Sequence, residues 1–150
     1  MSLFLSSFTN KIDAKGRVAV PATFRSAIAA DQFAGVVLYR SFQNKCVEGL
    51  SFGRMEQIAA ATDSMNIFDD KLDDMTALLF ADARQCAFDV TGRIVLPPDL
   101  IAHAGISENA LFVGRGRSFQ IWNPEDFAAH QSAALEKLKS EKPNLVLNRQ

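Results

Sequence analysis

Short apolar runs separated by turn residues make up much of the hydrophobic pattern of this chain. Residues 36–40 and 110–113 are two such runs; the first predicts a buried strand and the second a further strand. A second apolar segment follows each of them, at 46–48 and at 118–122, which predicts two returning strands. The apolar residues within 4–8 predict a further strand, or an arm that packs against a sheet edge.

Helix-type patterns lie between these strands. Short helices are predicted at 22–28 and around 54–61, and a longer one runs from an Asn-Pro start at 123 to about 142. The middle of the chain shows an apolar stripe at helical spacing beneath a face of aspartates, with Ser64 or Asn66 as its expected N-cap. The residues of this stripe are Phe68, Leu72, Met75 and Leu79.

One nine-residue signature occurs twice, at 13–21 and at 89–97. Aspartate, glycine, arginine and proline recur in the same order, with apolar residues between them, and the offset is constant at 76 residues (89 − 13). Four matched positions in one register would rarely arise by chance. The chain therefore contains an internal duplication.

Each copy of the signature predicts a strand, a tight turn, a second strand and a short helix. Asp13 and Asp89 open the turns, where a carboxylate accepts bonds from backbone N–H groups. Gly16 and Gly92 supply the positive φ angle that a tight turn requires. The proline that closes each copy ends the strand and suits the first turn of a helix.

The charge of the chain is small overall and unevenly distributed. The formal net charge is −1, which argues against a generally basic nucleic-acid binder. Residues 1–25 nevertheless hold four cations against one aspartate, a net charge of +3, whereas residues 56–82 hold seven carboxylates against one lysine, a net charge of −6. A local basic patch can bind an anion even in a chain that is nearly neutral.

Cysteine usage and hydropathy indicate a cytoplasmic protein. Cys46 and Cys86 lack the spacing of a metal site or a disulfide framework, so a reducing compartment is expected. No apolar run approaches the length of about 20 residues that crosses a membrane, and the first residues lack the basic region of a signal peptide. His103 and His130 are isolated, so no metal site is expected.

The two turns differ in their cations. Lys11, Lys15 and Arg17 surround the first turn, where they would present positive charge to phosphates, and arginine is the residue that binds guanine with two bonds. The second turn keeps Arg93 but lacks both lysines, and Arg84 compensates in part. We expect the first turn to be the main anion contact and the second to be secondary. The simpler alternative is that both are solvated hairpin tips.

The duplicated aspartates also admit an enzymatic interpretation. Two related carboxylates on duplicated turns form the catalytic pair of aspartic proteases, where they share one proton. In those enzymes glycine follows two residues after the aspartate, whereas here it follows three residues after, and an arginine comes next. An adjacent arginine keeps a carboxylate ionised. We therefore favour Asp13 and Asp89 as turn-capping groups that orient Arg17 and Arg93.

The duplicated signature and its flanks resemble the MraZ family, bacterial transcription regulators with two tandem SpoVT/AbrB-type domains. The matching flanks are Ala104-Gly105, Phe112-Val113-Gly114 and the run from Phe119 to Pro124. The resemblance implies a mainly β fold with flanking helices, a duplicated, partly open double-split β-barrel with a pseudo-twofold repeat. Residues 7–54 and 83–126 would form the two repeats, 55–82 the connector helices, and 127–150 a C-terminal helix and tail.

The resemblance also implies a function. Such proteins are repressors of the division and cell-wall gene cluster that contains their own gene, bind short G-rich direct repeats in double-stranded DNA, and assemble into ring-like homo-oligomers. Carried over to this chain, the DNA-binding residues are Lys11, Lys15, Gly16, Arg17 and Arg93. No enzyme activity, cofactor or membrane association is expected, and the location is the cytoplasm, in association with the nucleoid. The alternative is an antitoxin-like barrel that binds a toxin as well as DNA.

Overall fold

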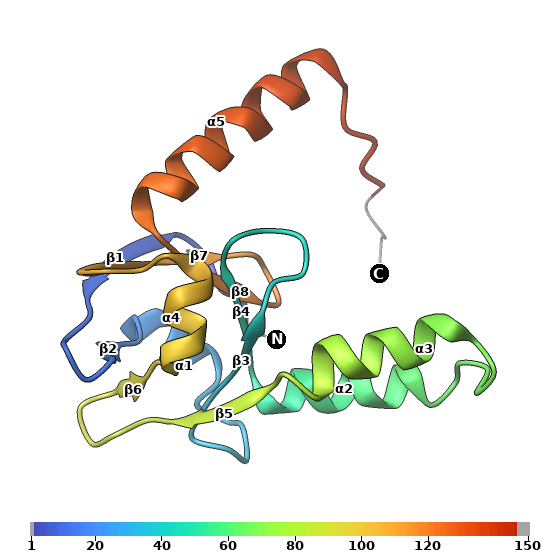
Figure 1. Ribbon diagram of the computed structural model, residues 1–150, viewed down its shortest axis with the longest axis horizontal. Coiled ribbons are helices and arrows are strands. Elements are labelled where there is room, and N and C mark those ends of the chain that lie inside the picture. The colour runs from blue at the N-terminus through green and yellow to red at the C-terminus, as the bar shows by residue number, and fades with distance from the viewer. Residues whose placement is uncertain (1, 147–150) are drawn as a thin grey trace.

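The same order of elements occurs twice in the computed structural model, which describes residues 2–146 (Figure 1). The first repeat contains β1 (Ser7–Lys11), β2 (Arg17–Ala19), α1 (Ala22–Ala27), β3 (Gly35–Arg40), β4 (Val47–Leu50) and α2 (Phe52–Thr62). The second contains β5 (Arg84–Ala87), β6 (Arg93–Val95), α4 (Pro98–Ala104), β7 (Asn109–Gly114), β8 (Phe119–Trp122) and α5 (Pro124–Ser140). Between them lie α3 (Asp70–Met75) and a π-helix, η1 (Thr76–Phe80).

Two antiparallel sheets carry the symmetry of the duplication. The larger has the strand order β1-β7-β8-β4-β3-β5, and exchanging each strand for its counterpart in the other repeat gives the same order reversed. The smaller is a two-stranded ribbon of β2 and β6, in which Val18 pairs with Ile94, its own counterpart at the offset of 76. A pseudo-twofold axis therefore passes between these two residues. The predicted fold class, mainly β with flanking helices, is confirmed.

The strands that flank each signature turn do not form the local hairpin that the sequence predicts. Within the first copy, the isolated bridge between Ile12 and Val18 joins the two sides, while β1 pairs with β7 and β2 with β6. The physical reason is burial: Val18 and Ile94 are 0% and 1% exposed, and pairing them across the axis covers both at once. Each repeat thus completes its sheets with strands of the other.

A core of aromatic side chains holds the ribbon on the larger sheet. Phe24 of α1 lies at its centre, with its ring 5.2 Å from Phe4, 5.7 Å from Phe8 and 5.4 Å from Phe119, measured between ring centroids. Its counterpart at the offset of 76 is Leu100 of α4, which is also fully buried. The two short helices therefore cover the ribbon from equivalent positions and fix its position.

The connector between the repeats is helical, as its stripe predicts, but it begins later. Asp69 is the N-cap of α3, because its carboxylate accepts the backbone N–H of Lys71, whereas Asn66 caps a turn by accepting the N–H of Phe68. Phe68 consequently lies outside the helix and is 85% exposed, while Leu79 is buried. Only the C-terminal end of the predicted stripe packs against the sheet.

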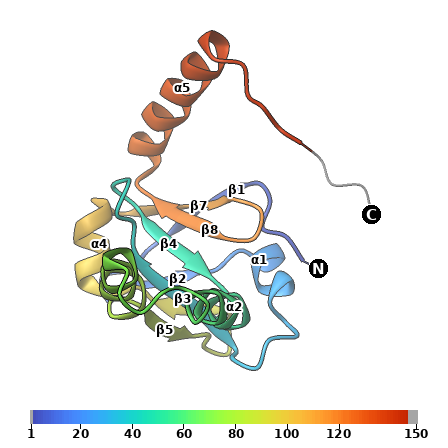
Figure 2. The same ribbon diagram turned by 90° about the vertical axis from the view of Figure 1, so that its right-hand side faces the viewer.

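Helix α5 stands away from the sheet in both views (Figures 1 and 2). Its predicted start is confirmed, since the Asn123 side chain accepts the backbone N–H groups of Glu125 and Asp126. Its end is Ser140, slightly earlier than the predicted position. Leu135 and Leu138 remain 55% exposed. Most of the predicted tail, 147–150, lies outside the described residues, and within those described no helix is long and apolar enough to cross a membrane.

Candidate nucleic-acid interface

The first signature turn is organised by one carboxylate. Asp13 Oδ1 accepts the backbone N–H groups of Lys15 at 3.0 Å and Arg17 at 2.8 Å, and Asp13 Oδ2 accepts Arg17 Nε at 2.7 Å. The Asp13 carbonyl accepts the N–H of Gly16, which has a φ angle of 83°. The aspartate therefore shapes the turn and orients the arginine at the same time.

The second turn repeats this arrangement nearly atom for atom. Asp89 Oδ1 accepts the backbone N–H groups of Thr91 at 2.9 Å and Arg93 at 2.9 Å, and Asp89 Oδ2 accepts Arg93 Nε at 3.0 Å. Thr91, which stands where the first turn has Lys15, adds a hydroxyl bond to the same carboxylate. Gly92 has a φ angle of 80°. The two turns thus share one geometry but differ in charge.

Hydrogen bonds keep both carboxylates ionised. The backbone N–H of Arg17, followed by its side chain and the N–H of Lys15, lowers the pKa of Asp13. The backbone N–H of Arg93 and the Thr91 hydroxyl lower the pKa of Asp89 far below its usual range. Because each carboxylate is bound by its own turn, the two do not share a proton. This is the opposite of what the aspartic protease chemistry requires.

The ion pairs leave the outer edge of each arginine available. A guanidinium has five N–H donors, and in Arg17 and Arg93 the carboxylate binds the one on Nε. Among the described residues, the terminal nitrogens of both side chains have no hydrogen-bond partner. In arginine–guanine pairs of protein–DNA complexes, two donors on one guanidinium edge bind guanine O6 and N7 together. Exposed ion pairs of this kind add little stability, so their main effect is to fix the orientation of the arginine side chain.

The ribbon of β2 and β6 presents both arginines on one face. Arg17 pairs with Val95 and Ala19 pairs with Arg93, so the four side chains lie outward while Val18 faces the core. Diagonal neighbours in an antiparallel pair have Cα atoms about 7–8 Å apart, which brings the two arginines within one contact area. A two-stranded ribbon of this size fits the major groove of DNA.

The remaining residues predicted for the interface lie at the same end. Lys11, at the end of β1, and Lys15, in the turn, are exposed. Asn10, next to Lys11 on β1, donates its side-chain amide to the Ala19 carbonyl at 2.7 Å. Gly16 is buried, and its carbonyl accepts the N–H of Leu96 at 2.8 Å. The glycine therefore takes part in a backbone hydrogen bond that joins the two repeats.

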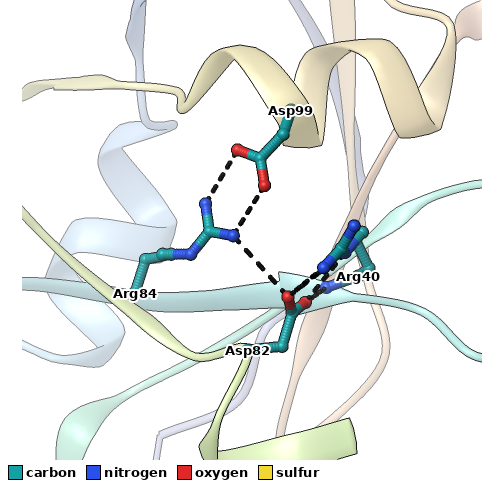
Figure 3. A network of polar contacts seen from close by, with 4 residues as sticks. All are labelled: Arg40, Asp82, Arg84 and Asp99. Atoms are coloured by element: carbon teal, nitrogen blue, oxygen red, sulfur yellow. Dashed lines mark hydrogen bonds and ion pairs between the residues drawn. The ribbon is translucent and has the colours of Figure 1, made fainter.

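Arg84 does not supply charge to the second turn, contrary to the sequence-based expectation. Figure 3 shows its guanidinium between two aspartates, with Asp99 bound at 2.8 and 2.6 Å and Asp82 at 3.6 Å. Asp82 also binds Arg40, and the hydrogen bonds from Arg84 lower the pKa of Asp99 to about 2. The charge of Arg84 is neutralised in a network that ties β3, β5 and α4 together.

The molecule is electrically polarised. The acidic helix α3, between the repeats, extends to one side of the sheet, while the loops that join β1 to β2 and β5 to β6 lie at the opposite side of Figure 1. An anionic polymer is repelled by the first end and attracted to the second. The charge distribution therefore favours an approach that brings the polymer to the ribbon.

One cation beside the second turn escaped the sequence-based prediction. Arg25 of α1 belongs to the first repeat, yet its guanidinium lies against Gly92. Its counterpart at the offset of 76 is Ile101, so the duplication gives no charge pattern that would reveal it. The signal that was available was the basic balance of residues 1–25, which includes Arg25.

Replacing Gly16 by alanine is expected to lower the free energy of unfolding by about 1–3 kcal/mol. A Cβ there would lie 2.8 Å from the Leu96 carbonyl oxygen, in addition to the strain of a φ angle of 83°. Gly116→Ala is the matched control, because Gly116 has a φ angle of 84° and no atom within 4 Å of the added Cβ. Urea unfolding at one protein concentration would measure both variants. Equal destabilisation of the two would show that the contact between the repeats contributes nothing.

The geometry defines a duplicated β protein whose two-stranded ribbon carries an arginine from each repeat, and the similar proteins known by name agree with this class. A family model described as "MraZ protein, putative antitoxin-like" matches residues 79–148. Proteins named "Transcriptional regulator MraZ" from Rickettsia peacockii (strain Rustic) and Rickettsia canadensis (strain McKiel) are 38% and 37% identical over 142 residues, which cover 95% of this chain and 95% of each relative. The chain belongs to the MraZ family.

Proposed function

We propose that this protein is a sequence-specific DNA-binding transcriptional regulator that acts as a repressor. Its target is the division and cell-wall gene cluster that contains its own gene, where it binds short G-rich direct repeats. It works in the cytoplasm, at the nucleoid, and it binds DNA without catalysing a reaction. The relatives named as transcriptional regulators support the general function, and the chemistry of the ribbon supports the preference for guanine.

The observation that carries this proposal is the pair of aspartate-held arginines on one ribbon face. A free arginine side chain loses conformational entropy when it binds a base, whereas Arg17 is already held by Asp13 through Nε. Its terminal nitrogens then form an oriented pair of donors that can face the major groove. Guanine is the one base that offers two acceptors at that spacing there. Lys11 and Lys15 add phosphate contacts that position the ribbon without reading sequence.

The protein is expected to act as a ring-like homo-oligomer. One chain presents two signature turns, which can neutralise only a few phosphates and would give weak, salt-sensitive binding. Several copies of the ribbon would engage successive repeats on one DNA molecule. Exposed apolar side chains away from the ribbon, including Leu135, Leu138 and Leu78, supply surfaces for contacts between copies.

Footprinting of the purified protein on the DNA upstream of its own gene tests the proposed function. We expect protection of two or more short direct repeats, with the strongest protection at guanines, and reduced transcription from that DNA in a purified system. Uniform, sequence-independent coverage of the fragment would contradict specific recognition. Protection without reduced transcription would contradict the repressor role alone.

Arg93→Ala is expected to weaken DNA binding less than Arg17→Ala does. The first turn has Lys11 and Lys15 beside its arginine, whereas the second has Thr91 in place of Lys15. The first turn therefore offers more phosphate contacts than the second, and its arginine belongs to the stronger of the two sites. Mobility shift assays with both variants on the same fragment would measure the ranking. An equal or larger loss of affinity in Arg93→Ala would overturn it.

An antitoxin-like role is the second candidate, favoured by the description of the family model that matches this chain. Helix α5 stands off the body with Leu135 and Leu138 exposed, as a helix that binds a separate protein would. Hydrogen exchange on the free protein separates the two candidates. Protection of α5 in the purified protein alone would assign this surface to other copies of the chain, and a monomer with an unprotected α5 would favour a different partner.

A further inference from the structure

The second signature turn has a neighbour from the other repeat. Arg25 Nε donates to the Val20 carbonyl at 3.1 Å, which anchors the side chain beside the end of β2. A Cβ built on Gly92 would lie 2.7 Å from both Cζ and Nε of Arg25. The guanidinium therefore occupies the space where a side chain at position 92 would be. Gly92 is needed for this approach as well as for its positive φ angle.

The charge of Arg25 is held in place but is not neutralised. Arg17, Arg40, Arg84 and Arg93 each bind a carboxylate. Arg25 is half-buried, and within the described part of the chain no carboxylate oxygen lies within 4.0 Å of it. Its anchoring bond uses one of five N–H donors. A partly buried cation with unused donors is a favourable partner for an anion that comes from outside.

Comparison of the two turns shows that a cation has changed position between the repeats. At the offset of 76, Lys15 corresponds to Thr91 and Arg25 corresponds to Ile101. Ile101 lies beside Gly16 just as Arg25 lies beside Gly92, with its Cδ1 3.6 Å from the Cβ position. The first turn therefore has a lysine in the loop and an apolar helix neighbour, while the second has a neutral loop and an arginine neighbour.

We propose that Arg25 completes a phosphate-binding site at the second turn, so that the first repeat supplies the cation that the second repeat lacks. The ligand is a phosphodiester group of the DNA backbone next to the base contacted by Arg93. Packing alone does not require a charge here, because isoleucine fills the equivalent space at the first turn. Each chain then offers two complete contacts, each with one aspartate-held arginine and at least one phosphate-binding cation. This inference rests on the proposed DNA-binding function.

Three variants separate a phosphate contact from a packing role. Arg25→Met keeps a long side chain against Gly92 but removes the charge. Arg25→Lys keeps the positive charge, because lysine binds phosphate as a point charge. Arg54→Met is the matched control: Arg54 is also half-buried, its side chain donates to Gln57 alone among the described residues, and it lies on α2, away from the turns. Thermal unfolding of all three variants would show whether each one folds as stably as the unchanged protein.

The measurement is the affinity of each full-length variant for a duplex from upstream of its own gene, over a series of salt concentrations. Arg25→Met is expected to bind about tenfold more weakly. The slope of log affinity against log salt should become shallower by about 0.9 for each phosphate that the variant no longer neutralises. Arg25→Lys should retain the slope, and Arg54→Met should match the unchanged protein.

The outcomes distinguish this inference from the proposed function. If Arg25→Met keeps the affinity and the salt slope while Arg17→Ala no longer binds, the phosphate contact is refuted and the DNA-binding function stands. Equally weakened binding by Arg25→Met and Arg25→Lys without a change in slope would also refute it, since this indicates a structural role. If the unchanged protein binds no DNA specifically, the proposed function itself fails.

Discussion

Arg17→Ala is expected to abolish specific DNA binding while the protein stays folded. A bidentate arginine–guanine contact contributes about 1–3 kcal/mol of discrimination, and the substitution removes one such contact from each copy in an oligomer. The substitution also removes the cation bound to Asp13 Oδ2, so the carboxylate charge then repels the phosphates. The fold should be nearly unaffected, because substitutions at exposed positions change stability by about 0.5 kcal/mol or less. Mobility shift and thermal unfolding would measure the two effects separately.

Two further variants define which property of Arg17 matters. Arg17→Lys keeps the charge but removes the planar pair of donors, so it should bind DNA without distinguishing the operator from other sequences. Lys15→Ala should weaken binding to all sequences to a similar degree, because lysine contacts phosphate and not bases. Parallel loss of folding and binding in Arg17→Ala would mean that the residue is structural, and the site assignment would be wrong.

Affinity is expected to rise steeply with the number of operator repeats. Once one ribbon of an oligomer is bound, the next repeat is engaged within the same complex at a high effective concentration. Going from one repeat to three should therefore raise affinity by about a hundredfold or more without any new residue type. The same duplexes should show a salt dependence that steepens with each added repeat, because more phosphates are neutralised.

Mobility shift on duplexes with one, two and three repeats would measure this effect, alongside light scattering of the free protein. A duplex with three repeats spaced so that one complex cannot reach them together is the matched control. It should bind no more tightly than a single repeat, apart from the statistical factor. A monomer that binds one repeat as tightly as three would contradict the oligomeric mechanism.

The local chemistry of the turns was predictable from sequence, but the pairing of the strands was not. Asp13 shapes its turn through bonds to residues within four positions, among them the bond from the Gly16 N–H to its carbonyl, so residue type and spacing suffice to predict the turn. The partner of β2 lies 76 residues away, and a hairpin with β1 satisfies the same local pattern. The free energy gained by burying Val18 together with Ile94 favours pairing with β6 over a local hairpin. This gain depends on the assembled core, so the local sequence does not reveal it.

Side-chain partners from distant segments account for the errors within the site. In the sequence, Arg84 looks like a free cation because its closer ligand, Asp99, comes from the next helix. Asp82, which is near it in sequence, lies farther from its guanidinium, at 3.6 Å. Arg25 is separated from Gly92 by 67 residues (92 − 25), so no spacing rule connects them. Charge patterns along a chain predict which residues are cationic, and the fold decides which of them remain available.

Replacing guanines of the operator repeats with 7-deazaguanine tests whether the aspartate-held arginines bind guanine edges. This base keeps the pairing and the phosphates but lacks the N7 acceptor. We expect the unchanged protein to bind the modified duplex more weakly where the replaced guanines are those that it protects, and we expect Arg17→Ala to show no further weakening. Equal affinity of the unchanged protein for modified and unmodified duplexes would contradict this expectation.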